Sequence, residues 1–401
     1  MNVTEQSKAR IILSKVPEVT IFFWIIKVLC TTVGETFSDF INENLGLGLI
    51  HTTVLMGIAF FIVVYLQFRA TKYIPGLYWL TVVLISVFGT LVTDNLTDGM
   101  GVPLELSTIV FSILLLLTFL FWYLNEKTLS IHSIYTRKRE AFYWLTILFT
   151  FALGTAVGDL YSEKLGLGYL PTGIIVASII ICVFIVYKLF KLDSVLAFWI
   201  AYIFTRPLGA SLGDFLSQPS KYGGLGLGAT ITSVIFLSAI LGIIIFLVVT
   251  KCDINPKKNE VITTQESNKS NKNVSKQTIA VLVVFLFVGL SSYFYFNNQI
   301  AQDLSQTTLK GLLTDFITIE NDMKNDVNSN NFAAVKTSAD DLEHEWDTHA
   351  AKLQKIDKKT WSQIDGTIDS VLASTRASNP DTNKCTSSIN DSLSALNGAN
   401  K

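Results

Sequence analysis

The segment GETFSD, at positions 34–39, places two carboxylates, Glu35 and Asp39, inside an otherwise apolar stretch. Its pattern is Gly, three residues, a small residue and Asp. The same pattern returns three times, as GTLVTD (89–94), GTAVGD (154–159) and GASLGD (209–214). Four copies at matching places exceed what chance would produce, so the sequence predicts a fold built from repeated units.

Each copy lies inside a longer repeated unit. A tryptophan stands ten residues before each motif glycine, at positions 24, 79, 144 and 199. The spacings of 55, 65 and 55 residues indicate a duplicated pair of units. A glycine-containing turn follows each motif, at 45–48, 100–103, 165–168 and 225–228, and a second apolar segment then completes the unit.

Apolar segments dominate the chain, in which half of the 401 residues are hydrophobic and 16% are charged. A soluble protein carries about 25% charged residues. A membrane-spanning helix needs about 20 apolar residues, and nine segments fit: 19–40, 51–68, 76–95, 104–124, 141–160, 170–190, 195–216, 229–250 and 277–297. We therefore predict an all-α polytopic membrane protein with four tandem two-helix repeats (eight spans), a ninth span and a small helical extracytoplasmic domain.

The positions of Lys and Arg predict the orientation, because these residues accumulate in cytoplasmic loops. They gather at 8–15, 69–72, 127–139, 188–191 and 251–276, all on one side of the predicted membrane. We expect a cell-membrane protein with a cytoplasmic N-terminus (1–18), an eight-span repeat domain (19–250), a Lys-rich cytoplasmic linker (251–276), a ninth span (277–297) and an extracytoplasmic domain (298–401).

The C-terminal domain has apolar residues at helical spacing in about three segments, separated by connections at 328–331 and 355–359. We expect the Ser- and Asn-rich run from Ser378 onward to be frayed. The acidic segment HEWDTH (344–349) is not the HExxH pattern of a zinc site. It is typical of a solvated helix face, and weak capture of cations near a pore mouth is the functional alternative.

The motif residues fall into two chemical groups. The small residues, such as Gly34 and Ser38, form small-xxx-small pairs that allow close helix packing in a membrane. The acids have no such explanation, because a charge in a membrane is costly unless it is paired. The bases at comparable depth are Arg206 and Lys27, of which Lys27 is expected to reach toward the cytoplasmic surface. The remaining carboxylates must hold protons or a bound cation.

Carboxylate and hydroxyl oxygens are hard ligands that suit Mg, Ca or Mn ions and protons. We therefore expect a substrate site formed by Glu35, Asp39, Asp94, Asp159, Asp214 and Arg206. The ligands of a divalent metal ion would be Asp39, Asp94, Asp159 and Asp214. Their raised pKa in a dry environment would permit exchange of the ion for protons. One turn beyond the motif aspartates lie Glu43, Asp98, Glu163 and Gln218.

The stretches VPEVTIFFWIIKVLCTTVGETFSDF (16–40) and FWIAYIFTRPLGASLGD (198–214), with the repeated LGLG, resemble a bacterial multi-pass repeat family described as uncharacterised membrane-anchored proteins. The resemblance covers roughly residues 15–250. It implies a repeat membrane domain and no particular substrate. Its motif positions here are Glu35, Asp39, Asp159, Arg206 and Asp214.

These features favour a secondary transporter of a divalent cation that is exchanged for protons. A membrane scaffold or sensor, whose outer domain binds a partner, is the first alternative. A permease for a small organic solute, contacted by Arg206 and Trp199, is the second. We expect the protein to interact with the lipid bilayer and with the transported ion or small solute, and not with nucleic acid. A second copy of the chain and an extracytoplasmic protein are further candidate partners.

We do not expect an enzyme or a cofactor other than a bound divalent cation. The sequence lacks the GxxxxGK[ST] nucleotide motif. His51 is the single histidine in the repeats, so serine-hydrolase chemistry has no suitable base. The four Cys residues form no CxxC pair, and we expect Cys30 and Cys182 to be packing residues.

Overall fold

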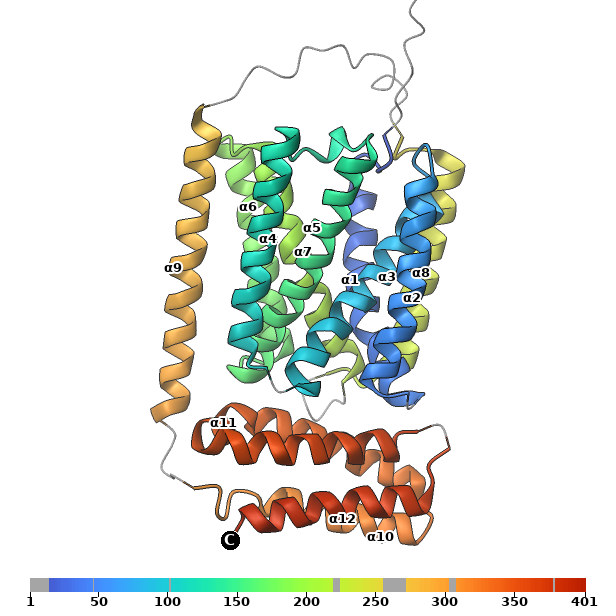
Figure 1. Ribbon diagram of the computed structural model, residues 1–401, viewed down its shortest axis with the longest axis vertical. Helices are drawn as coiled ribbons and strands as arrows, with labels where there is room; N and C mark the ends of the chain where they lie inside the picture. Colours follow the sequence, from blue (N-terminus) through green and yellow to red (C-terminus); the bar gives the residue numbers. More distant parts are fainter. Residues whose placement is uncertain are drawn as a thin grey trace, which may run out of the picture.

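The computed structural model describes residues 14–45, 47–100, 102–218, 224–254, 272–302, 308–377 and 379–401, in which all regular structure is helical (Figure 1). Nine helices in these ranges are long and apolar enough to cross a membrane. The predicted fold class, with its four two-helix repeats, is therefore confirmed. Residues 1–13 of the predicted N-terminus, residues 219–223 before the fourth glycine-containing turn and linker residues 255–271 lie outside the described residues.

The first helix of each repeat belongs to an inner ring. These helices are α1 (Ile21–Asp39), α3 (Pro75–Asp94), α5 (Arg137–Asp159) and α7 (Ser194–Ser217). Helix α1 packs against α3 and α7, and α5 also packs against both, which closes the ring. More than half of each inner helix is buried. The carboxyl ends of the four helices, which carry the motif aspartates, therefore lie at the same end of the ring.

The second helix of each repeat lies outside this ring. These helices are α2 (Leu49–Arg69), α4 (Leu104–Glu126), α6 (Tyr169–Leu189) and α8 (Gly228–Thr250). Each packs mainly on the inner helix of the next repeat, since α2 contacts α3, α4 contacts α5, α6 contacts α7 and α8 contacts α1. Their apolar side chains, among them Ile58, Ile113 and Ile181, are exposed. Such a belt fits contact with lipid and indicates insertion in a membrane. Cys182, predicted to be a packing residue, is exposed on α6.

The motif glycines form the contacts between neighbouring inner helices. Gly34 faces Ser86 of α3, Gly89 faces Phe151 of α5, Gly154 faces the Arg206 stem of α7, and Gly209 faces Thr31 and Thr32 of α1. A methyl group at Gly209 would lie 2.9 Å from the backbone nitrogen of Thr32. A larger residue at these positions would push adjacent helices apart, as expected for small residues at membrane helix interfaces.

The half of the ring that holds the amino ends of the inner helices is filled by aromatic side chains. The hydroxyl groups of Tyr78 and Tyr143 share a hydrogen bond of 2.5 Å, and Trp79 and Trp144 pack beside them. At the surface of this half, the backbone nitrogen of Glu18 donates to the carbonyl of Asp253, at 3.0 Å. The residues that precede α1 and those that follow α8 therefore meet.

Helix α9 (Lys272–Gln302) runs along the outside of the bundle to its opposite end (Figure 1). Tyr161 of the third repeat bonds the Ser292 hydroxyl at 2.7 Å, and the Tyr293 hydroxyl donates to Glu105 at 3.2 Å. The ring of Phe285 packs on that of Phe204, with centroids 5.2 Å apart. The ninth span thus packs on the repeats through specific contacts.

The C-terminal domain comprises α10 (Thr314–Asn328), α11 (Phe332–Thr375) and α12 (Thr382–Ala399), stacked beneath one end of the bundle in Figure 1. We call this end of the bundle the capped end. The connection predicted at 355–359 is a kink inside α11, where Asp357 has non-helical backbone angles.

The tail beyond Ser378 was predicted to be frayed, and this prediction was wrong. Asp381 caps α12 by accepting from the Lys384 nitrogen at 2.8 Å. Cys385, Ile389, Leu393 and Leu396 form one buried face of the helix against α10 and α11. This apolar spacing outweighs the polar composition, because tertiary packing supplies most of the stability of a helix.

Candidate binding chamber

A π-helical turn follows each of the first three motif aspartates. Asp39, Asp94 and Asp159 end their α-helices, and the next five residues form the turns η1 (Phe40–Asn44), η2 (Asn95–Gly99) and η4 (Leu160–Lys164). In the fourth repeat α7 remains α-helical through Asp214 to Ser217. Turns of the π type are uncommon and often occur at functional sites. Their recurrence at one position of three repeats marks this end of the ring.

All five predicted carboxylates line one cavity of about 1060 Å³ at the capped end, which we call the chamber. Glu35 and Asp39 come from the first repeat, and Asp94, Asp159 and Asp214 come from the other three. Glu163 and Gln218 also line the chamber. The side chains of Glu43 and Asp98 lie outside the described residues.

The C-terminal domain supplies the other wall of the chamber. Its charged lining residues are five acids, Asp340, Glu343, Asp347, Asp365 and Asp369, and three bases, Lys336, Lys358 and Arg376. In total, eleven carboxylates and four Lys or Arg side chains line the chamber. Weak cation capture near a pore mouth was the functional alternative predicted for the acidic segment around HEWDTH, whereas Asp365 and Asp369 were not predicted from the sequence. The spacing of acids at 340, 343 and 347 places them on one face of α11, and this was the available signal.

Arg206 lies beneath the chamber and is fully buried. Its Nη2 atom donates to Oε2 of Glu35 and to Oγ1 of Thr90, both at 2.5 Å. The side chain starts on α7, crosses to α1 and α3, and passes Gly154 of α5, so it contacts all four inner helices. Its Nε and Nη1 atoms are buried with no hydrogen-bond partner among the described residues. The guanidinium therefore lies between the four inner helices, and two of its nitrogen atoms, Nε and Nη1, donate no hydrogen bond to a described residue.

Lys27 is also buried, although it was predicted to reach the membrane surface. Its ammonium lies over the rings of Phe151 and Tyr202, 3.8 and 4.3 Å from their centroids. This cation–π arrangement holds the charge inside the ring. Trp199, proposed as a contact for an organic solute, lies in the aromatic half, where its indole donates to the Leu129 carbonyl at 2.9 Å.

The predicted metal ligands surround the chamber without forming a compact ligand set. Among the described residues, no group of three or more His, Cys, Asp or Glu side chains could hold a metal ion directly. Asp39, Asp94, Asp159 and Asp214 are thus brought to one cavity, but they are not gathered as direct ligands. A cation in the chamber would keep water between itself and most of these carboxylates.

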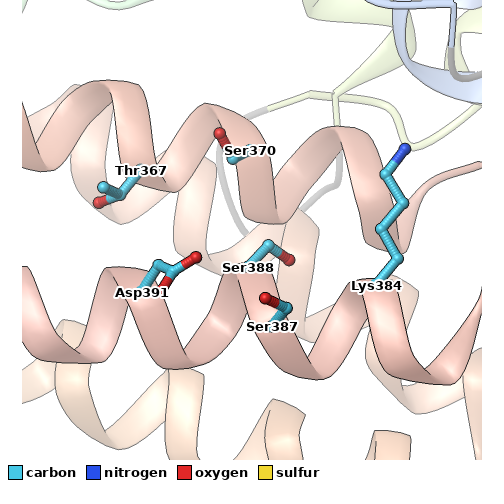
Figure 2. Close-up of a pocket in the computed structure, with 6 residues that line it drawn as sticks. All are labelled: Thr367, Ser370, Lys384, Ser387, Ser388 and Asp391. Atoms are coloured by element: carbon cyan, nitrogen blue, oxygen red, sulfur yellow. The ribbon is translucent and has the colours of Figure 1, made fainter.

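A smaller depression of about 270 Å³ lies between α11 and α12 (Figure 2). Six polar or charged residues line it: Thr367, Ser370, Lys384, Ser387, Ser388 and Asp391. Ser388 shares a hydrogen bond of 2.6 Å with Ser374 across the two helices. No residue predicted from the sequence as part of the site lies there.

The family described as Repeat of Unknown Function (DUF347) matches residues 22–73, 77–128, 142–192 and 197–252, which together exceed half of the chain. Each match spans one two-helix repeat. No curated protein and no solved structure matches the chain.

Proposed function

The chain belongs to the Repeat of Unknown Function (DUF347) family, and we propose that it is a secondary transporter of a cation. The observation that carries the proposal is the chamber, which receives a motif aspartate from each of the four repeats. Eleven carboxylates outnumber four basic side chains in its lining, so the chamber attracts positive charge. The capped end, which carries the C-terminal domain, would face away from the cytoplasm.

A hydrated divalent cation is the substrate that this geometry favours. Mg²⁺ gives up its water reluctantly and often binds through one or two carboxylates with several waters retained. A chamber of about 1060 Å³ leaves room for such an ion, and no compact set of three direct ligands is needed. An organic cation would use the same charge and volume, and it is the second candidate.

Transport requires the chamber to open toward the other side of the membrane. In the described conformation the path is blocked by Arg206 and, deeper in the ring, by Lys27 and the aromatic side chains around Tyr78. A cation that pairs with Glu35 would compete with Arg206 for this carboxylate, which weakens the block. The five chamber carboxylates are partly buried, and we expect them to hold either protons or a cation, because an uncompensated charge in such surroundings is costly. Proton release on one side would thus accompany cation binding.

The test is uptake by purified protein in liposomes, with Mg²⁺, Ca²⁺ and Mn²⁺ supplied separately and internal pH recorded. We expect Asp39→Asn and Asp214→Asn to reduce uptake at least tenfold while the protein stays monodisperse. Asp322→Asn changes an exposed acid of α10, away from the chamber, and should transport normally. Uptake that both chamber variants leave unchanged would sink the proposal.

The same assay separates the alternatives. Uptake of a labelled polyamine, without uptake of metal ions, would favour the organic cation. A scaffold or sensor predicts no solute movement by the wild-type protein. Its cellular phenotype would instead depend on residues 298–401.

A further inference from the structure

We propose that Lys27 couples the movement of the cation to the movement of a proton, because a proton on its amine and a cation at its level of the ring exclude each other. The inference rests on the proposed transport function and assigns the coupling proton to one side chain. It concerns the interior of the ring and not the walls of the chamber.

The repeats arrange the interior of the ring in levels. Positions one helical turn apart lie on the same face of a helix, and the positions 15, 11, 7 and 3 residues after each repeated tryptophan form four such levels. From the chamber inward, the levels are Asp39, Asp94, Asp159 and Asp214; Glu35, Thr90, Thr155 and Ala210; Thr31, Ser86, Phe151 and Arg206; and Lys27, Val82, Ile147 and Tyr202.

The contacts in the ring agree with these levels. Each motif glycine faces the third-level residue of the next repeat around the ring, as Gly34 faces Ser86 and Gly209 faces Thr31. All residues of the third and fourth levels are buried, whereas the motif aspartates of the first level are partly exposed in the chamber. The levels therefore run from the chamber into the closed part of the ring.

Lys27 is the one charged residue of the fourth level. It precedes Glu35 by eight residues of α1, a rise of about 12 Å along the helix. On α7, Tyr202 of the same level lies one turn from Arg206 of the third level. A cation that leaves the chamber through the ring thus passes the level of Arg206 and then that of Lys27.

The Lys27 ammonium has no carboxylate partner among the described residues and lies instead over the rings of Phe151 and Tyr202. Helix α8, which packs on α1, contributes no titratable side chain. The titratable or charged side chains that surround this part of the ring are Cys30 on α1, Tyr78 on α3, Tyr143 on α5, and Tyr202 and Arg206 on α7. A buried intramembrane charge with no opposite charge beside it is costly, and such residues often carry function.

The two basic residues of the ring differ in chemistry. Arg206 is paired with Glu35, and an arginine keeps its proton in proteins. A buried lysine, in contrast, gains and loses a proton readily. Lys27 is therefore the base of the ring that is suited to proton exchange.

A cation beside the Lys27 ammonium would place two positive charges close together where little water screens them, and such charges repel strongly. The cation therefore passes this level when Lys27 is a neutral amine. The ammonium releases its proton to the side from which the cation arrives. The amine then takes up a proton from the side to which the cation leaves. Each passage of a cation thus moves a proton in the opposite direction.

The experiment uses the full chain in liposomes whose interior is more acidic than the outside, with the membrane potential clamped by potassium and valinomycin. Uptake of Mg²⁺, Ca²⁺ or Mn²⁺, supplied separately, is recorded together with internal pH. We expect the wild type to accumulate the ion above its outside concentration while the interior becomes less acidic. Equal pH on both sides should abolish the accumulation.

Two substitutions at Lys27 have different expected results. Lys27→Met removes the exchangeable proton and the charge, so ions should enter only until their concentrations are equal, whatever the pH difference. Lys27→Arg keeps a permanent charge and should slow uptake at least tenfold. Lys27→Gln also lacks the amine and replaces Lys27→Met if that variant aggregates. Lys188→Met is the matched control, since Lys188 also lies over aromatic rings but is exposed on α6, and it should behave as the wild type.

The outcomes separate this inference from transport. Accumulation driven by pH in Lys27→Met, or uptake at the wild-type rate in Lys27→Arg, would overturn the role of Lys27 and leave the transporter standing. Complete loss of uptake in a monodisperse Lys27→Met protein would also contradict it, because removal of the charge should admit cations to this level. A wild-type protein that takes up none of the three ions would remove both proposals.

Discussion

At the scale of single residues, each motif joins a packing position to a chemical position five residues later. Gly209, for example, brings α7 against Thr31 and Thr32 of α1, and Asp214 then lines the chamber. The close contact at the glycine determines where the carboxylate points. This coupling explains why the two residue types recur together in all four repeats.

Replacing a motif glycine should therefore damage the ring. We expect Gly209→Ala to destabilise the protein by about 1–3 kcal/mol, the usual cost of overpacking. Gly242→Ala on α8 is the matched control, because a methyl group there meets no atom within 4 Å. Alanine favours a helix over glycine by about 0.5–1 kcal/mol, so the control should be neutral or stabilising. The stability of both variants is measured by thermal unfolding in detergent, with the folded fraction monitored by size-exclusion chromatography.

The pair formed by Arg206 and Glu35 gives a second prediction at this scale. Arg206→Gln leaves Glu35 without its buried partner and should cost about 3–5 kcal/mol. The double variant Glu35→Gln/Arg206→Gln removes both charges and should be more stable than Arg206→Gln alone. The same unfolding assay gives the coupling between the two positions. Strictly additive effects would show that the ion pair contributes no coupling.

At the scale of elements, the three π-helical turns and α11 form the chamber rim. The sequence was sufficient to predict the inner helices, since Gly, Trp and Asp recur at fixed spacing. It also placed Asp39 and Asp214 at matching ends of parallel elements. The position of α11 depends on long-range packing, and the motifs of the repeats carry no information about it. The prediction that Lys27 reaches the cytoplasmic surface was wrong for a similar reason. The rings that hold its ammonium belong to Phe151 and Tyr202, which lie far from Lys27 in the sequence.

The core of the C-terminal domain contains a titratable group that gives a pH dependence. Glu320 of α10 is buried, and burial raises its pKa to about 8, although it accepts a hydrogen bond from Ser392 at 2.5 Å. Between pH 4.5 and 8 the folded domain keeps a proton that the unfolded chain has released. Stability contributed by this group therefore falls as pH rises, by about 1.4 kcal/mol per pH unit at most.

Glu320→Gln should flatten this dependence, because glutamine does not titrate. Hydrogen exchange of peptides from α10 and α12, corrected for the intrinsic effect of pH, measures local stability from pH 5 to 8. We expect protection in the wild type to decrease with pH and protection in the variant to change less. Equal slopes would show that Glu320 is ionised in the folded domain.

At the scale of the whole molecule, the structure places the residues before α1 and after α8 at one end and the C-terminal domain at the other (Figure 1). The charge pattern predicts that the first end is cytoplasmic. A membrane-impermeant maleimide tests this in a Cys182→Ser background. Cys252, which is exposed near Asp253, should react only after the cells are permeabilised. A cysteine introduced by Lys384→Cys should react in intact cells, and the reverse result would invert the proposed topology.

The contact of α8 with α1 also means that the ring has no spatial beginning or end. Glu18 and Asp253 already meet through their backbones, so a short peptide could join residue 254 to residue 14. New termini could then open in the segment 127–136, between the second and third repeats. Such a circular permutant would keep every contact between neighbouring repeats, although the order in which the spans enter the membrane would change.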